Sequence, residues 1–305
     1  MKIVIVGAGA MGGLFAVRLA VGGQDVSLVE VCQRTVEAIQ HQGLRLVTPA
    51  SSERVKLPIA SADAYSGTFD LLIILTKGFH TEVAIESVRH LVGPTTWVLS
   101  VQNGLGNAQL IAKVVPADHI LVGMTNLPAD LLEPGVIHSH GDGHVAIWSW
   151  DGRQNPAVLE IARVFQASGL PCQADPHVQI AIWEKVAFNA ALNGVCAITR
   201  QAVGCIGHCE DGRLLADSII DETLQVAGAM GIAVHKDRVR QAVAYAFEHQ
   251  ARHKPSMLQD VESGRKTEID FIQGAVVDLG RQKGVDTPVL QCLHRLVKLI
   301  EAGYT

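Results

Sequence analysis

Short apolar runs and amphipathic segments alternate along the first 174 residues of the chain. Residues 2–6 form a β-branched run of strand length, and the aliphatic segment at residues 70–75 is typical of a strand buried on both faces of a parallel sheet. Further extended segments are predicted at residues 26–29, 44–47, 54–59, 97–101, 119–122 and 170–173, and helices at residues 33–42, 80–91, 107–114 and 156–168. Residues 135–148 alternate as a β-hairpin does. This order of elements predicts an α/β fold with an N-terminal doubly wound sheet of the Rossmann type.

Beyond residue 174 the apolar pattern is almost only helical. Helices are predicted at residues 177–197, 213–230, 237–251 and 268–283, with a last helix from residue 287 onward. Thr287 and Pro288 are the N-cap and first-turn residues that such a helix start favours. We therefore predict two domains, a dinucleotide-binding Rossmann domain over residues 1–174 and an all-helical domain over residues 175–305.

The first strand is followed by Gly7, Gly9 and Gly12 in the spacing G-x-G-x-x-G. The first glycine permits a tight turn, the second lets backbone amides approach a pyrophosphate, and the third lets the next helix pack on the strand. A glycine turn without a ligand is the alternative, but the complete strand, turn and helix context favours a dinucleotide. The predicted contacts are Gly7, Ala8, Gly9, Ala10, Met11 and Gly12.

Three polar side chains follow predicted strands, at the edge where a doubly wound sheet binds its ligand. They are Glu30, Lys77 and Asn103. Glu30 lies about 20 positions beyond the glycines, where a carboxylate can accept hydrogen bonds from both hydroxyls of an adenosine ribose.

The first helix of the second domain carries a polar stripe on an otherwise apolar segment. Lys185, Asn189 and Asn193 are spaced i, i+4 and i+8, so they fall within an arc of about 80°. A solvated helix face is the alternative, although asparagine is a poor helix former and such faces more readily use Glu, Lys or Gln. Glu268 is expected in the first turn of its helix, where an ordinary helix-start charge is the competing interpretation.

Composition limits the classes of partner. The net charge of −5 over 305 residues gives no electrostatic footprint for nucleic acid or an anionic membrane, and 48% hydrophobic residues are ordinary for a globular protein. The longest aliphatic runs are too short to span a bilayer. Because the first predicted strand begins at residue 2, we expect no signal peptide and a cytoplasmic protein.

Two groups of potential metal ligands occur in the sequence, Cys205 with His208 and Cys209, and His138 with His140 and His144. The C-x3-C spacing has no second pair at zinc-site distance, and His138 and His140 lie on an alternating, strand-like segment. The six cysteines show no disulfide-scaffold spacing, which fits a reducing compartment. We predict no metal site and interpret both groups as ordinary core or surface residues.

Six separated motifs occur in an order that is similar to a known family. They are Gly7-Ala-Gly-Ala-Met-Gly12, Thr76-Lys77, Gln102-Asn103-Gly104, Trp183-Glu-Lys185-Val-Ala-Phe-Asn189-Ala-Ala-Leu-Asn193, Ser256-Met-Leu-Gln-Asp260 and Thr267-Glu268-Ile-Asp270. The chain resembles the ketopantoate reductase (2-dehydropantoate 2-reductase) family from residue 2 to its last helix. The resemblance implies a Rossmann domain, a helical domain like that of 6-phosphogluconate dehydrogenase, and an active site in the cleft between them.

The resemblance also implies roles for individual residues. Lys185 would be the catalytic lysine, which gives a proton to the carbonyl oxygen while NAD(P)H gives hydride to the same carbon. Asn103 would contact both cofactor and substrate, and Glu268 would contact the cofactor and the lysine. The implied substrate-binding positions are Asn189, Asn193 and Ser256, and the implied cofactor contacts include Lys77 and Ala129. The partner would be a small 2-keto acid, and a homodimer is plausible for an apolar helical domain.

Two departures from the family pattern leave the cofactor and substrate open. Glu30 replaces an arginine that pairs with the 2′-phosphate of NADPH, so Glu30 favours NADH where the family default is NADPH, with Arg34 able to offset this. Gly194 and Pro255 also differ from the family residues. The main hypothesis is reduction of ketopantoate to (R)-pantoate in pantothenate biosynthesis. The alternatives are an NAD-dependent D-2-hydroxyacid dehydrogenase of the D-mandelate type and a non-catalytic dinucleotide-sensing protein.

Overall fold

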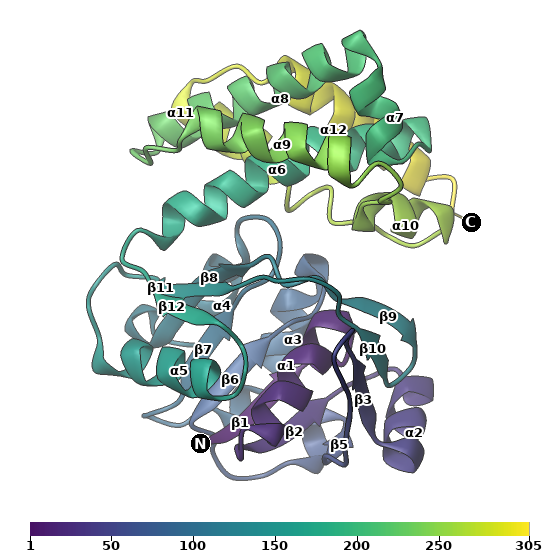
Figure 1. Cartoon of the computed structure of the whole chain (residues 1–305). Coiled ribbons are helices and arrows are strands. Elements are labelled where there is room, and N and C mark those ends of the chain that lie inside the picture. Colours follow the sequence, from purple (N-terminus) through teal and green to yellow (C-terminus); the bar gives the residue numbers. More distant parts are fainter. Residues whose placement is uncertain (305) are drawn as a thin grey trace. The chain divides into compact units, whose positions relative to one another are not determined.

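An eight-stranded sheet forms the core of the first of two compact units. The computed structural model describes residues 1–304 (Figure 1). One unit comprises Met1–Gln102 and Asn107–Val178, and the other comprises Asn103–Gly106 and the chain from Gln179 onward. The predicted fold class, a Rossmann-type sheet followed by a helical region, is confirmed. The domain division between residues 174 and 175 stays a prediction.

The strand order of the large sheet is that of a dinucleotide-binding domain. The strands lie in the order β12 (Cys172–Ala174), β11 (Val145–Ser149), β8 (Ile120–Thr125), β7 (Trp97–Ser100), β6 (Leu71–Ile74), β1 (Lys2–Val6), β2 (Asp25–Val29) and β5 (Ile59–Ala60). From β5 to β8 all neighbours are parallel, whereas β11 runs antiparallel to β8. The chain continues from β1 to β2 on one side and later returns to β6 on the other, so the order reverses between β1 and β6. Ligands of such sheets bind outside the carboxyl ends of the strands at this point.

The helices of this unit follow the strands as the apolar pattern predicts. They are α1 (Ala10–Val21), α2 (Gln33–Gln42), α3 (Thr81–Ser87), α4 (Asn107–Ile111) and α5 (Pro156–Ala167), with short 3-10 turns at Ala62–Ala64, Gly78–His80, Arg89–Leu91 and Ala117–His119. Every residue of β6 is buried, as expected for a strand covered on both faces.

A second, smaller sheet corrects one prediction. It consists of β4 (Ser52–Val55), β3 (Leu44–Val47), β10 (Val136–His138) and β9 (Asp130–Glu133), in that order. The hairpin predicted at residues 135–148 is therefore wrong, because β10 pairs with β3 and β9 while β11 belongs to the large sheet. Alternation along a strand records which side chains are buried, and it is the same whichever strand is the partner. Helix α1 packs on the small sheet, and a Cβ at Gly13 would come within 2.4 Å of Ile137.

In the part of the second unit that the structure describes, all regular structure is helical. Its helices are α6 (Val178–Thr199), α7 (Val203–His208), α8 (Glu210–Ala229), α9 (Lys236–His249), α10 (Ser256–Glu262), α11 (Gln273–Lys283) and α12 (Pro288–Glu301). Buried residues of α6 belong to one hydrophobic core with apolar side chains of the later helices. Helix α12 starts with Thr287 at the N-cap and Pro288 inside the first turn, as predicted. The apolar pattern predicted neither α7 nor α10, because six or seven residues are too few to show a helical period.

Candidate active site

The loop after β1 contains three glycines, and the surroundings of each glycine differ. Gly7 has φ +103°, and a Cβ there would lie 3.1 Å from the backbone of Leu75 at the end of β6. A Cβ at Gly12 would lie 1.9 Å from the Gly7 carbonyl oxygen, so only glycine permits this approach of α1 to the loop. A Cβ at Gly9 would meet no protein atom within 4 Å. The fold thus requires Gly7 and Gly12 for its own packing, whereas Gly9 leaves space on the outer side of the loop.

This space lies at the start of α1, and the residues fit a dinucleotide. Gly9 is the N-cap of α1, and its lack of a side chain leaves the first turn without a side-chain cap. Helix α1 has 12 residues, so its N-terminal N–H groups and dipole favour an anion. An anionic pyrophosphate at this end would meet backbone donors without meeting a Cβ at Gly9.

Glu30 lies where β2 ends and holds the glycine loop to that strand. Its Oε2 accepts a hydrogen bond from the Ala8 N–H at 2.9 Å, and its Oε1 accepts from the N–H groups of Val31 and Cys32 at 2.8 and 2.9 Å. The carboxylate is therefore fixed beside the loop by three backbone donors. Arg34, in the first turn of α2, is exposed.

A network around Gln102 joins the carboxyl ends of β6 and β7. Gln102 Nε2 donates to the Thr76 carbonyl and to Thr81 Oγ1, both at 2.8 Å, and its Oε1 accepts from Ser100 Oγ at 2.8 Å. Lys77 begins the turn between Thr76 and Thr81 and is half-buried. Gln102 belongs to one of the six motifs, but its role in this network could not be predicted, because it depends on β6 and β7 being neighbours in the sheet.

Ala129, the remaining predicted cofactor contact, directly precedes β9 and is half-buried. Its role stays a prediction.

In the helical unit, Lys185 on α6 has an unusual electrostatic environment. Burial lowers the pKa of its ammonium from the ordinary 10.5 to about 8, and the charge of the nearby Glu268 carboxylate acts in the opposite direction. Glu268 is 5% exposed. A lysine whose pKa lies near the working pH is suited to exchange a proton, which an ordinary surface lysine does poorly.

Glu268 is not in a helix, which corrects the prediction of a helix over residues 268–283. Helix α11 begins at Gln273, and turns precede it. Side chains of α12 hold this segment, because Glu301 accepts hydrogen bonds at 2.7 Å from both the N–H and the hydroxyl of Thr267. Asp270 accepts from His294 and Lys298 at 2.8 and 2.9 Å.

The first residue of α11, which directly follows this turn, is also connected to α6. Gln273 Nε2 donates to the Ala190 carbonyl of α6 at 3.1 Å, and Gln273 is fully buried. The helix-start interpretation of Glu268 is therefore wrong. Its position is set by bonds from its neighbours to α6 and α12.

The turn that carries Asn103 belongs to the helical unit, although it follows β7 in the chain. The Leu105 N–H donates to the Phe271 carbonyl at 2.8 Å. Gly104 has φ +80°, and a Cβ there would lie 2.2 Å from the same carbonyl oxygen. The Asn103–Gly106 turn is thus bonded to the turn of Glu268, and this turn leads into α11, whose first residue is bonded to α6.

The polar stripe of α6 is not a solvated face. Asn193 is only 5% exposed, and Lys185 and Asn189 are half-buried. Burial of amides on an apolar helix needs hydrogen-bonding partners, so this stripe faces a polar neighbourhood inside the unit or a ligand. Ser256 is the first residue of α10 and is exposed, with Pro255 as the N-cap.

Comparison with known proteins is consistent with this geometry. A family model described as Ketopantoate reductase PanE/ApbA matches residues 3–152, and its C-terminal counterpart matches residues 177–301. The chain belongs to the ketopantoate reductase family. The 2-dehydropantoate 2-reductase of Streptococcus pyogenes serotype M6 is 33% identical over 99% of this chain and 98% of the relative. That of Halobacterium salinarum is 32% identical over 99% of both chains.

Solved structures of ketopantoate reductases and of a related dehydrogenase have the same fold. D-mandelate dehydrogenase in a ternary structure with NADH and anilino(oxo)acetate gives a TM-score of 0.95 at 30% identity, over 100% of this chain and 99% of the other. A PanE/ApbA family ketopantoate reductase from Ralstonia eutropha gives 0.92 at 30% identity, with the same coverage. The predicted family and its assignment as a nicotinamide-dependent oxidoreductase are confirmed. Over residues 1–304, no helix combines the length and apolarity of a membrane-spanning segment.

Proposed function

We propose that the chain reduces the keto group of ketopantoate to give (R)-pantoate, with NAD(P)H as the reductant, in pantothenate biosynthesis. The observation that carries the proposal is a half-buried lysine of lowered pKa on a polar helix stripe, in a chain that covers 98–99% of the length of its 2-dehydropantoate 2-reductase relatives. The overall reaction consumes one keto acid, one reduced cofactor and one proton. It yields the 2-hydroxy acid and the oxidised cofactor.

Lys185 supplies the proton in this proposal. As the carbonyl carbon gains a hydride, its oxygen becomes an alkoxide, and an ammonium at that oxygen stabilises charge that is fully present only in the transition state. The lowered pKa makes the Nζ proton easier to transfer. The charge of the nearby Glu268 carboxylate acts in the opposite direction to burial and favours the charged ammonium.

The amide groups of the stripe would orient the keto acid. Asn189 and Asn193 follow Lys185 on one side of α6, and each offers both a donor and an acceptor to a carboxylate, keto or hydroxyl group. Asn103 lies on a turn bonded to the turn of Glu268, which supports a contact with the reacting end of the substrate. Ser256 would add a hydroxyl from α10. Such positioning lowers the entropic cost of reaching the reactive geometry.

A bound reduced nicotinamide would supply the hydride. The glycine loop and the start of α1 would hold the pyrophosphate, and Glu30 the adenosine ribose. Lys77 and Ala129 are the further proposed contacts in this unit.

We expect NADH to be preferred over NADPH. Three of the lone-pair positions of the Glu30 carboxylate are used by backbone N–H groups, which fixes its negative charge beside the glycine loop. A 2′-phosphate about 4 Å away would be repelled by several kcal/mol at an effective dielectric of about 20, before screening by salt. Arg34 is exposed and can pair with that phosphate, so we expect a preference of roughly tenfold in kcat/KM and not exclusion.

A D-2-hydroxyacid dehydrogenase acting on another bulky 2-keto acid is the second candidate. The resemblance to D-mandelate dehydrogenase with NADH supports it, as does Glu30. Gly194 adds a local observation, because a Cβ there would lie 2.7 Å from Gln273 Nε2. This chain has therefore packed a buried glutamine into the space next to Asn193, where the family pattern has a larger residue.

One panel of assays distinguishes these candidates. Ketopantoate, benzoylformate and branched aliphatic 2-keto acids would each be reduced with NADH and with NADPH, and Lys185→Ala would serve as the inactive control. The proposal expects ketopantoate to have the highest kcat/KM. A higher value for benzoylformate would favour the dehydrogenase, and no cofactor oxidation with any acid would restore the non-catalytic sensor.

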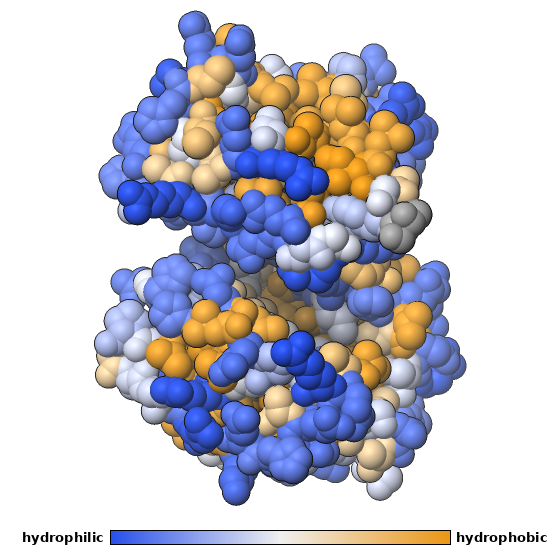
Figure 2. Space-filling view, turned by 90° about the vertical axis from the view of Figure 1, so that its right-hand side faces the viewer, coloured by the Kyte–Doolittle hydropathy of each residue, from blue (hydrophilic) through white to orange (hydrophobic). Residues whose placement is uncertain are grey.

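We also propose a homodimer formed through the helical unit. Figure 2 shows apolar side chains gathered on the surface of this unit, and among its exposed hydrophobic residues are Leu214 of α8, 58% exposed, and Leu299 of α12, 70% exposed. Helices α8 and α12 are in contact with each other. Sedimentation velocity tests the proposal, because Leu299→Glu should shift a dimer toward monomer, whereas Val83→Glu on α3 should not.

A further inference from the structure

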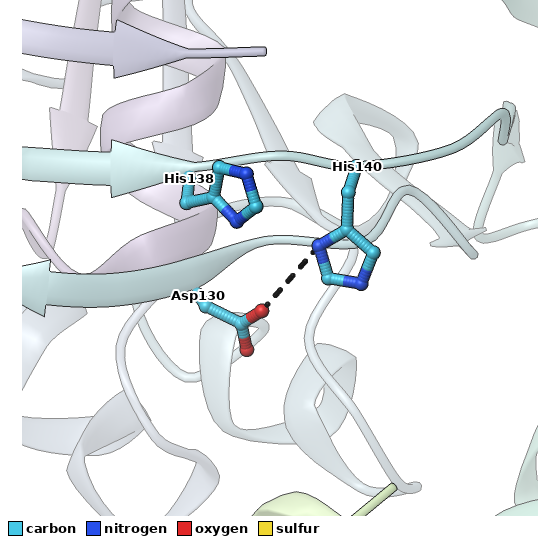
Figure 3. Close-up of side chains that lie close together, drawn as sticks. All are labelled: Asp130, His138 and His140. Atoms are coloured by element: carbon cyan, nitrogen blue, oxygen red, sulfur yellow. Dashed lines mark ion pairs between the residues drawn. The ribbon is translucent and has the colours of Figure 1, made fainter. Parts of the chain in front are cut away.

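Two strands of the small sheet bring together three side chains that are far from the glycine loop in sequence. His138 ends β10, His140 follows two residues later, and Asp130 begins β9 (Figure 3). Asp130 and His138 are direct partners in the antiparallel register. Residues i and i+2 on an extended segment point to the same side, which brings His140 to the side chains of the other two.

The distances between these side chains are close to those of a metal site. One ligand atom from each of the three residues lies within 4.8 Å of the other two, and His140 Nδ1 is 3.6 Å from Asp130 Oδ2. Nitrogen and oxygen atoms bound to one tetrahedral ion at about 2.1 Å lie about 3.4 Å apart. The His140 and Asp130 side chains are about half exposed, so few neighbouring atoms oppose the small rotations that this spacing needs.

We propose that Asp130, His138 and His140 bind one divalent first-row transition-metal ion, with the remaining coordination positions taken by water. Two imidazoles and one carboxylate are a ligand set typical of Zn²⁺, Co²⁺ and Ni²⁺, and surface exposure gives the ion a path of entry. The bound ion would join β9 to the chain beyond β10. The prediction of no metal grouped His138 and His140 with His144 and rested on their strand-like segment, whereas the structure places Asp130 of the neighbouring strand beside them.

A simple ion pair between His140 and Asp130 explains less of the arrangement. Such a pair needs a protonated imidazole and one partner, yet the His138 ring stacks on the His140 ring with centroids 5.2 Å apart. The ion pair leaves the position of this third side chain unexplained, whereas two imidazoles and a carboxylate can share one cation. His144 lies on the same segment, is exposed, and is outside this cluster, so it provides a matched control.

The test uses the full-length protein without an affinity tag, stripped by a chelator and titrated with Co²⁺ and then Zn²⁺. Equilibrium dialysis gives the number of ions per chain, and the visible absorption of bound Co²⁺ reports whether its ligands are nitrogen and oxygen or thiolate. The variants are His138→Ala, His140→Ala and Asp130→Asn, with His144→Ala as the control. A Cys205→Ser, Cys209→Ser double variant tests the exposed thiols as competing ligands.

The proposal expects one ion per chain, a dissociation constant weakened roughly tenfold or more in each of the three site variants, and little change in the controls. It also expects a metal-dependent rise in Tm that those variants lose. Circular dichroism and the Tm without metal show whether each variant is folded. If an alanine variant does not fold, Asp130→Asn still tests the site, because asparagine keeps the shape of the aspartate side chain. The proposal is overturned by no binding up to about 100 μM, by equal loss in His144→Ala, or by binding that disappears only in the cysteine variant.

Discussion

The pH dependence of reduction tests the proposed proton donor most directly. Burial holds the pKa of Lys185 near 8 instead of 10.5, a change that corresponds to a penalty of roughly 3 kcal/mol on the charged form. The proton donor is the charged form, so reduction should be fully active well below pH 8 and decline above it. With a pKa of about 8, roughly nine-tenths of the donor is protonated at pH 7 and roughly one-tenth at pH 9.

The assay measures kcat/KM for the keto acid at saturating reduced cofactor, between about pH 6 and pH 10 at constant ionic strength. We expect kcat/KM for reduction to fall about tenfold per pH unit above the midpoint. For oxidation of the hydroxy acid, which needs the neutral lysine as base, kcat/KM should rise with pH over the same range. Glu268→Gln removes the charge that opposes the effect of burial, so its midpoint should move to lower pH. Asp278→Asn, on an exposed part of α11, is the matched control and should keep the midpoint of the unmodified chain.

A profile that stays flat to pH 10 would refute the reasoning, because it would mean that Lys185 either keeps an ordinary pKa or gives no proton in the step measured. If the midpoint is the same in Glu268→Gln, only the claim that the Glu268 charge raises the pKa of Lys185 would be refuted.

The other predictions concern single positions. Lys185→Ala should lose on the order of 10² to 10⁴ in kcat with little change in cofactor affinity, measured by steady-state kinetics and fluorescence titration; a variant above about a tenth of the original kcat would contradict the assignment. Glu30→Arg should reverse the preference between NADH and NADPH in kcat/KM, and an original preference for NADPH would show that Arg34 decides the choice. Gly12→Ala should destabilise the fold by several kcal/mol in urea unfolding, because its Cβ would overlap the Gly7 carbonyl. The folded-state pKa of Asp270 is lowered from 3.8 to about 2, so its contribution to the free energy of unfolding is complete above about pH 4 and is lost as the pH falls toward 2. In urea unfolding at several pH values, Asp270→Asn should remove that pH dependence. It should also lower the free energy of unfolding at pH 7 by about 1 kcal/mol, a value that allows for the partial exposure of the side chain.

Features that depend on neighbouring residues along the chain were predictable from the sequence. The β1 strand, the glycine loop and the start of α1 all lie within residues 2–12, so their geometry is set by local sterics and by the φ values that glycine permits. The stripe of Lys185, Asn189 and Asn193 was visible because the helical period is a local property. Thr287 and Pro288 marked the start of α12 for the same reason.

Features that depend on which distant segments meet required the tertiary structure. Strand alternation did not distinguish β10 and β11 as members of two sheets, since a period of two is independent of the partner. The turn of Glu268 replaces a predicted helical turn because Thr267 and Asp270 bond to side chains of α12, and their partners lie 24 to 34 residues away.

The chemistry of the candidate sites also arises from such long-range contacts. The pKa of Lys185 depends on burial by a packed core, and Asp130 joins His138 through strand register. The sequence by itself determined the fold class, the dinucleotide loop and the identity of the polar residues, because these depend on the spacing of apolar residues and on steric contacts between residues near each other in the chain. The tertiary structure decided which turns are bonded to α6, how far the pKa of Lys185 is shifted, and which carboxylate lies beside two histidines, because desolvation and cross-strand distance exist only once the chain has folded.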